Sequence, residues 1–139
     1  MSGTALPGGC LCGAVRFTST AAPITVFHCL CRACQHVSGG AGTVNAVLPA
    51  DAVAIDGPVA WFESKGDSGA SLARGFCTTC GTTLFSRSHT LPDRIFIRVG
   101  AFDDPAQHGP AAAIWTASAP SWAPIDPTLP RFEHQPALA

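Results

Sequence analysis

Seven cysteines fall into three tight groups, and their spacing constrains the fold more than any other feature of the chain. The groups are a C-x-C pair, a C-x-C-x2-C triplet and a C-x2-C pair, namely Cys10 and Cys12, then Cys29, Cys31 and Cys34, then Cys77 and Cys80. Thiolates at such spacings can converge on one soft metal ion, typically zinc. A disulfide framework would leave one of the seven unpaired. The sequence therefore favours metal ligation over disulfide bonds.

The composition excludes some classes of partner. Charged residues make up 12% of the chain, hydrophobic residues 47%, and the formal net charge is −1. The absence of any Lys or Arg run argues against nucleic acid or an anionic membrane as the main partner. The longest apolar stretch, residues 41–55, is too short to span a bilayer and contains Asn45, Pro49 and Asp51. The low charge leaves apolar surface that a second subunit could cover, so the composition is compatible with a homodimer.

Length and the two ends of the chain predict its organisation. We expect a single zinc-binding domain over residues 1–139, with a core from about 8 to 125. The tail, residues 120–139, contains repeated prolines that exclude a regular helix or central strand, so it should wrap the surface, anchored by Trp122 or Phe132, or fray. Residues 1–9 lack the basic start and apolar stretch of a secretory signal. We therefore expect a cytoplasmic protein whose thiols stay reduced.

Short apolar segments separated by Gly, Pro and Asp predict a mainly β fold with little helix. The expected strands are residues 14–18, 24–27, 43–48, 53–55, 59–63, 72–76, 82–87, 94–99 and 111–116. Residues 32–37 could form one helical turn, ended by the glycine cluster at 38–42. This cluster lacks the Lys and Ser/Thr of a phosphate-binding loop. It is either a place of close backbone approach, where N–H groups face a ligand near the thiolates, or an ordinary flexible loop.

The two cysteine pairs are predicted to share one metal. Cys77 and Cys80, followed by Gly81, have the spacing of a zinc knuckle, in which a tight turn brings two sulfurs together. Cys10 and Cys12 lie on an extended segment, so their side chains point to the same face. Joined, the four would make a closed, structural zinc site, which we call the quartet. The alternatives are reduced core cysteines or an iron–sulfur ligand set.

The remaining triplet, Cys29, Cys31 and Cys34, is here called the trio. Three protein ligands leave one coordination position open, which is typical of catalytic zinc. A thiol substrate at that position would lose its proton near neutral pH, and a thiolate is a good nucleophile. The alternatives are a second structural site closed by His28 or His36, and a redox-active thiol cluster without metal. We expect two zinc ions per chain, the second more labile.

Four further residues are candidates for substrate binding or for support of the trio. Arg32 and Arg74 lie close to cysteines in the sequence and could bind a substrate carboxylate bidentately. Each could equally pair with a surface Asp or Glu, which is the interpretation we favour for Arg74. His28 and His36 could move a proton or orient a thiolate, although a polar residue at a strand end is the simpler interpretation. The three tryptophans are expected to pack in the core or at an interface rather than against a ligand.

Four segments, GCLCGAVRF at 9–17, HCLCRAC at 28–34, RGFCTTCGT at 74–82 and VGAFDDP at 99–105, carry a family resemblance. Their order is similar to that of the glutathione-dependent formaldehyde-activating enzymes, a family that includes the centromere protein V-like domains. The resemblance spans about residues 8–125. It implies an Mss4-like β fold of short antiparallel strands, with the quartet as the structural zinc site and the trio as the catalytic one. The family's named reaction joins glutathione to formaldehyde as S-hydroxymethylglutathione, formally a carbon–sulfur lyase reaction.

The chain departs from many family members near its C-terminus. Those members have a His-Ile strand and a Ser-Lys-x-Pro-Trp-like segment where this chain has residues 113–122, without the histidine or the lysine. The resemblance therefore implies a zinc-dependent carbon–sulfur lyase for a small, glutathione-like thiol adduct with an aldehyde or related electrophile, and leaves the thiol open. The alternative is a non-catalytic zinc scaffold or protein-interaction module.

Overall fold

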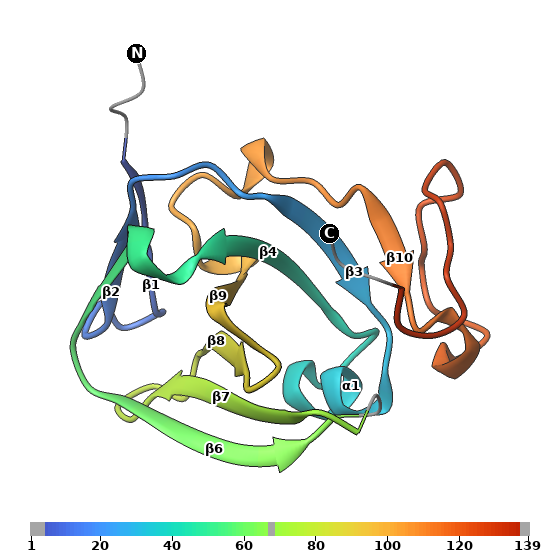
Figure 1. Cartoon of the computed structure of the whole chain (residues 1–139), viewed down its shortest axis with the longest axis horizontal. Helices are drawn as coiled ribbons and strands as arrows, with labels where there is room; N and C mark the ends of the chain where they lie inside the picture. The colour runs from blue at the N-terminus through green and yellow to red at the C-terminus, as the bar shows by residue number, and fades with distance from the viewer. Residues whose placement is uncertain (1–4, 67–68, 137–139) are drawn as a thin grey trace.

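The computed structural model describes residues 5–66 and 69–136. Within them the chain forms ten strands, arranged in two sheets, and little helix (Figure 1). The strands are β1 (Leu6–Gly9), β2 (Arg16–Ser19), β3 (Thr25–Cys29), β4 (Thr43–Pro49), β5 (Val53–Asp56), β6 (Val59–Lys65), β7 (Ser71–Cys77), β8 (Thr83–Ser88), β9 (Leu91–Arg98) and β10 (Ala112–Ile114). The helices are α1 (Arg32–Ser38) and the short 3₁₀ helices η1 (Ala50–Ala52), η2 (Val99–Ala101), η3 (Pro105–Gln107) and η4 (Thr116–Ser118). The predicted mainly β fold is confirmed.

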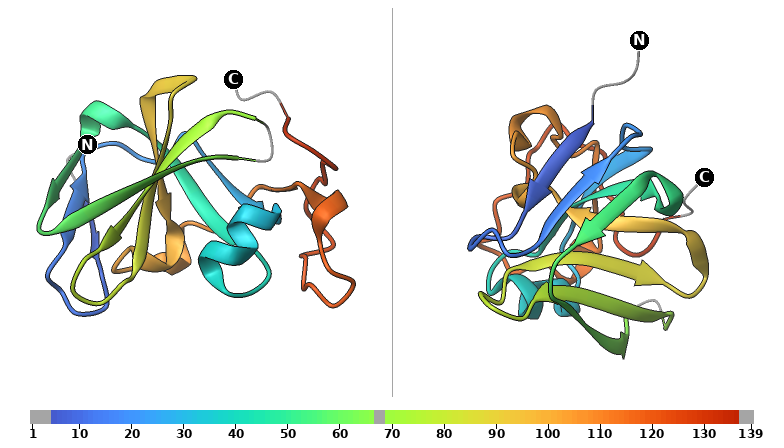
Figure 2. Two further views of the ribbon diagram at one scale, coloured as in Figure 1. Left: turned by 90° about the horizontal axis from the view of Figure 1, so that it is seen from below. Right: turned by 90° about the vertical axis from the view of Figure 1, so that its left-hand side faces the viewer.

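The larger sheet has the strand order β10-β3-β4-β9-β8-β7-β6. Figures 1 and 2 show that it curls, so that β6 and β7 lie across from β3 and β4, with α1 at the open side. Its neighbouring strands are antiparallel except β10, which runs parallel to β3. The expectation of antiparallel strands is therefore wrong for this pair. The segment 99–111, which contains η2 and η3, connects β9 to β10. This crossover is long enough for β10 to run in the same direction as β9.

The smaller sheet has the order β1-β2-β5 and includes a strand that the sequence did not predict. β1 has no alternating apolar pattern, and its Gly8 is required by close packing. A Cβ atom on Gly8 would lie 2.3 Å from the ring of Phe17 and 2.4 Å from the carbonyl oxygen of Ala101. The guanidinium of Arg16 binds both carboxylate oxygens of Asp103, at 3.1 and 2.6 Å. These contacts join the start of the chain to the crossover after β9.

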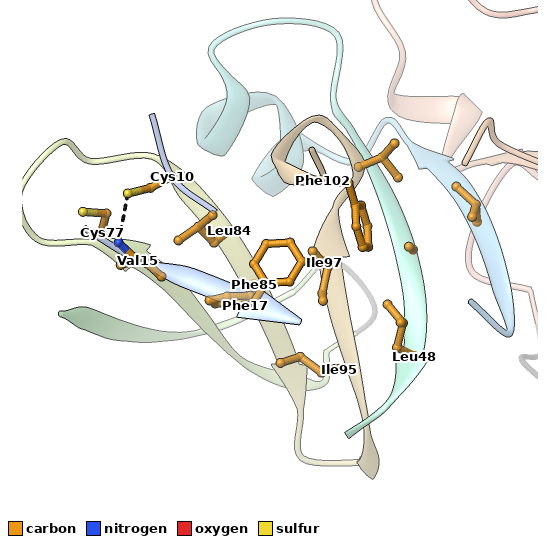
Figure 3. Close-up of a cluster of buried hydrophobic side chains, with 13 residues drawn as sticks. Cys10, Val15, Phe17, Leu48, Cys77, Leu84, Phe85, Ile95, Ile97 and Phe102 are labelled. Atoms are coloured by element: carbon orange, nitrogen blue, oxygen red, sulfur yellow. Dashed lines mark hydrogen bonds between the residues drawn. The ribbon is translucent and has the colours of Figure 1, made fainter. Parts of the chain in front are cut away.

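The main core lies between the two sheets and includes cysteines of the quartet (Figure 3). Phe17 makes edge-to-face contacts with Phe85 and Phe102, at ring-centroid distances of 5.5 and 5.3 Å. Cys10 and Cys77 are buried in the same cluster. The hydrophobic core and the proposed metal ligands therefore occupy one region. A substitution in the core is expected to affect the position of the ligands, and loss of a ligand is expected to affect core packing.

The glycine cluster after α1 approaches the backbone of β3 closely, which is a contact within the protein and not the expected approach to a ligand. α1 ends at Ser38 and is capped by Gly39, which has a left-handed conformation. Gly42 has φ +89°, and a Cβ atom there would lie 2.0 Å from the carbonyl oxygen of Cys29. Only glycine combines this conformation with such an approach. The turn therefore packs directly against the end of β3.

The proline-rich tail runs along β10 through backbone hydrogen bonds (Figure 1). The N–H of Phe132 donates to the carbonyl of Ala113 at 2.9 Å, and the N–H of Ala113 donates to the carbonyl of Pro130 at 2.9 Å. The anchor is thus the backbone of the segment around Phe132, because the side chains of Phe132 and Trp122 are 41% and 67% exposed. Across the described part of the chain, no helix has the length and apolar character needed to cross a membrane.

Candidate functional site

The quartet gathers four sulfur atoms at the junction of the two sheets. All four lie within 4.8 Å of one another. The Sγ of Cys12 is 3.6 Å from that of Cys10 and 3.8 Å from that of Cys77. Four sulfurs arranged tetrahedrally around zinc at about 2.3 Å would be separated by about 3.8 Å. The geometry of the quartet therefore fits a tetrahedral ion with four thiolate ligands.

Backbone and hydroxyl groups around the quartet donate hydrogen bonds to several of its sulfurs. The N–H groups of Val15 and Thr79 donate to the Sγ atoms of Cys10 and Cys77, at 3.2 and 3.3 Å. The hydroxyl and the N–H of Thr82 donate to Cys80, which lowers the pKa of Cys80 to about 5. Metal binding requires deprotonated thiols. These donors therefore prepare the site for a cation.

The trio is formed where β3 leads into α1. Cys29 is the last residue of β3, Cys31 caps the N-terminus of α1, and Cys34 lies in its first turn. The Sγ of Cys31 accepts a hydrogen bond from the N–H of Cys34 at 3.3 Å, the bond that a helix-capping side chain makes. The three Sγ atoms lie within 4.8 Å of one another. The end of a strand and the start of the next helix thus bring the three sulfurs together, all from residues 29–34.

The thiols of the trio stabilise negative charge on one of their members. Hydrogen bonds from Cys29 and Cys31 lower the pKa of Cys34, and the positive charge of Arg98 acts in the same direction. Donating these bonds raises the pKa of Cys29. A thiolate is therefore favoured at Cys34. Three such sulfurs are a suitable ligand set for zinc.

The two histidines considered as a fourth ligand lie elsewhere. Within residues 5–66 and 69–136, the group around the trio contains no His, Asp or Glu side chain. The Nε2–H of His28 donates to the carbonyl of Ala41 at 2.7 Å, which helps to hold the glycine turn. His36 is exposed, with its Nε2 3.4 Å from a guanidinium nitrogen of Arg32. This arrangement gives no support to a site closed by either histidine.

A cavity of about 410 Å³ opens beside the trio. Its walls contain the three cysteines of the trio, three aromatic residues, two arginines and three residues with hydroxyl groups. These are Cys29, Cys31, Cys34, Phe27, Phe96, Trp115, Arg74, Arg98, Ser86, Ser88 and Thr90. Apolar walls with a few polar groups are typical of small-molecule sites. The glycine turn does not line it. A small ligand could therefore reach the trio from this cavity.

Arg98 is a cavity residue that the sequence analysis missed. It is 8% exposed, and it donates from Nη1 to Asn45 Oδ1 at 2.6 Å and from Nη2 to Ser86 Oγ at 2.9 Å. Its Nε is buried without a partner among the described residues. Burial lowers the pKa of Arg98 to about 10, whereas negative charge on Cys34 raises it. In the predicted strand, Ile95 and Ile97 lie on one face and Arg98 on the other. A charged residue within this mostly apolar strand was the signal that could have identified Arg98.

The two arginines selected from the sequence have different surroundings. We favoured a surface ion pair for Arg74, and this is wrong, because Arg74 is 9% exposed and lines the cavity. Its Nη1 donates to Ser64 Oγ at 2.8 Å, and no acidic side chain of the described segments pairs with it. Arg32 is exposed on α1, contacts Gln35 and lies outside the lining of the cavity.

Trp115 also lines the cavity, although the sequence suggested packing alone. It has φ 57°, the one left-handed non-glycine residue in the described chain. Its indole N–H donates to Gln135 Oε1 at 2.9 Å, and its ring lies perpendicular to that of His134, with 5.4 Å between the ring centroids. The tail therefore holds this indole in place. Left-handed backbone at a non-glycine residue is often associated with a functional site.

Comparison with known proteins identifies the family. The sequence profile described as glutathione-dependent formaldehyde-activating enzyme matches residues 5–118. The chain belongs to this family. The predicted resemblance is thereby confirmed, and the matched range contains both cysteine sets and both cavity arginines.

The chain is also similar to two individual proteins. A Halomonas elongata protein, provisionally named as a glutathione-dependent formaldehyde-activating enzyme, is 27% identical over 127 residues, which cover 87% of this chain and 81% of that protein. A crystal structure of a Rhodobacter sphaeroides protein, a structural genomics target, superposes with a TM-score of 0.55 at 16% identity. The match covers 73% of this chain and 94% of the other. This second likeness supports the fold alone.

Proposed function

We propose that this family member is a zinc-dependent carbon–sulfur lyase that forms or splits the adduct of a small thiol with an aldehyde or related electrophile. The observation that supports this most is the trio, three sulfurs without a fourth protein ligand among the described residues, at the wall of a cavity of about 410 Å³. The quartet, in contrast, offers four ligands, and two of its cysteines, Cys10 and Cys77, are buried in the core. We assign it the structural zinc.

The trio would hold the catalytic zinc through the sulfurs of Cys29, Cys31 and Cys34. Zinc bound there would supply a Lewis acid and favour the thiolate form of a substrate sulfur. In the synthetic direction, the substrate thiolate adds to the carbonyl carbon and the C–S bond forms. The carbonyl π bond breaks, and its oxygen takes up the proton that the thiol released. The reverse step splits the same bond.

Residues of the cavity would bind and orient the adduct. Phe27, Phe96 and Trp115 form an apolar wall that excludes water from the carbon chain. Ser86 and Ser88 place hydroxyl groups in the same cavity, where they can bind a polar substrate group. We further propose a reducing, cytoplasmic location, since both cysteine sets would function as thiolates rather than disulfides.

A thiol–aldehyde screen tests this function. NMR exchange spectroscopy of glutathione or smaller thiols with formaldehyde or other aldehydes measures how fast each adduct forms and splits. The zinc-loaded protein should accelerate this exchange for at least one pair above the rate without protein, and removal of zinc should abolish the acceleration. If no pair in the screen is accelerated by a folded protein with two zinc ions, the scaffold alternative replaces the enzyme.

A further inference from the structure

Three buried polar side chains lie beside one another on the sheet that carries Cys29. They are Thr43 and Asn45 on β4 and Arg98 on β9. β4 lies between β3 and β9, and the register pairs Thr43 with Cys29 and Asn45 with Arg98. Paired residues of antiparallel strands, and residues two apart on one strand, point to the same face of a sheet. The three polar side chains therefore share the face of Cys29.

Hydrogen bonds join these side chains in one direction only. The Nη1 of Arg98 donates to Asn45 Oδ1 at 2.6 Å, and the Nδ2 of Asn45 donates to Thr43 Oγ1 at 2.7 Å. A guanidinium has no acceptor, so it must face the amide oxygen of Asn45, and the amide nitrogen then faces Thr43. Because the oxygen of Thr43 accepts this bond, its hydroxyl proton is left to be donated to a further group.

The group that receives this proton is the sulfur of Cys34. The side chain of Thr43 hydrogen-bonds to Cys34, which lowers the pKa of Cys34, as a bond donated to sulfur does. α1, which carries Cys34 in its first turn, packs against β4. A chain of donors thus leads from Arg98 through Asn45 and Thr43 to Cys34. We call it the relay.

We propose that Thr43 is a positioning residue of the trio, whose hydroxyl, oriented by Arg98 through Asn45, holds the Cys34 sulfur in place to bind the metal. This inference rests on the proposed function only in that the trio holds a metal ion. Hydrogen bonds to a metal ligand orient it and tune the metal that it binds. Thr43 does not line the cavity beside the trio, so its effect is independent of which substrate binds there.

Metal affinity tests the role of Thr43 without relying on turnover. Thr43→Val replaces the hydroxyl by a methyl group, and titration with a competing chelator measures the affinity for the first zinc released. Since loss of a group that supports a metal ligand costs about 10- to 100-fold in affinity, this zinc should bind at least about tenfold more weakly. Thr43→Ser, which keeps the hydroxyl, should retain most of the affinity. Thr25→Val, on β3 outside the relay and the cavity, should leave it unchanged.

Cobalt substitution separates positioning of the sulfur from a general effect on folding. With Co²⁺ in place of the first zinc, absorption reports charge transfer from sulfur to metal. A hydrogen bond to sulfur stabilises its lone pairs, so Thr43→Val should move this band to longer wavelength and Thr43→Ser should not. A purely structural role of Thr43 would lower the unfolding temperature and leave the band in place, which would overturn the proposal, as would unchanged zinc affinity in folded Thr43→Val.

Asn45→Asp tests the direction of the relay. A carboxylate only accepts hydrogen bonds, so the hydroxyl of Thr43 would donate to it instead of to Cys34, while Arg98 keeps a partner. The cobalt band should shift as in Thr43→Val, with little further shift when both substitutions are combined. An unmoved band in Asn45→Asp would overturn the proposal even if Thr43→Val fails to fold.

The proposed function fails by a different result. A first zinc whose affinity depends on Thr43, in a protein that accelerates no thiol–aldehyde pair, would reject the lyase and keep the relay. Acceleration with a first zinc that Thr43→Val does not weaken would reject the relay alone. A trio that takes up neither zinc nor cobalt would overturn both.

Discussion

Replacement of Cys77 by serine is expected to unfold most of the protein at room temperature. Cys77 is fully buried, belongs to the main core and supplies one of the four sulfurs of the quartet. Structural zinc can contribute folding free energy on the order of 10 kcal/mol, comparable to the whole stability of a small domain, about 5–15 kcal/mol. Loss of a thiolate ligand should therefore remove most of the stability. Thermal unfolding followed by circular dichroism, with zinc content per chain, measures the effect.

A neighbouring substitution provides the control for the Cys77 variant. Thr79→Ser changes an exposed side chain in the same turn and preserves the backbone N–H that donates to the Cys77 sulfur. It should unfold at nearly the temperature of the unmodified protein. If Cys77→Ser also unfolds at that temperature with one zinc fewer, the quartet does not stabilise the fold and its structural assignment is wrong.

Replacement of Cys31 by serine should abolish turnover while the protein stays folded. Serine is a preferred helix-capping residue, so its hydroxyl can accept the hydrogen bond that the Cys34 N–H now donates to sulfur. The variant therefore removes a zinc ligand and keeps the start of α1. Loss of residues that only support metal ligands costs about 10- to 100-fold in activity, so loss of a ligand should cost at least about 100-fold. Thiol–aldehyde exchange rates and zinc content measure this.

A second variant separates the ligand from the helix cap. Cys31→Ala removes both and should be less stable than Cys31→Ser by about 0.5–2 kcal/mol, with turnover equally low. Chemical denaturation of the two variants gives the difference. Unchanged turnover in Cys31→Ser would show that the trio is not catalytic. Unfolding of Cys31→Ser, similar to that of the Cys77 variant, would instead make the trio a second structural site.

Most strands were predictable because their apolar pattern is local. The strand expected at 43–48 is β4 (Thr43–Pro49), and the turn expected at 32–37 is α1 (Arg32–Ser38). β1 could not be found, because its Leu-Pro-Gly-Gly sequence carries no pattern and its pairing depends on the close approach of Gly8 to Phe17. The parallel direction of β10 depends on the route of the crossover, which is a property of the whole fold.

The grouping of the cysteines was predictable for the same reason, since the ligand pairs are close in sequence. The cavity was not, because it is formed by β3, β7, β8, β9 and the tail together. Arg74 was expected at the surface and Arg98 was not considered at all, because the sequence does not show which face of a strand lies over a cavity. Trp115 was assigned to packing because its contact with Gln135 appears only once the tail is folded back.

Stepwise removal of zinc tests the central claim most directly, namely that the quartet stabilises the fold and the trio binds the substrate. A chelator titration of the purified protein should be followed by metal release, circular dichroism and thiol–aldehyde exchange in the same samples. We predict two zinc ions per chain. Removal of the first should abolish turnover while the fold remains, and the second should be released only as the protein unfolds. Release of both ions together with unfolding, or turnover that persists after the first ion has left, would contradict the account.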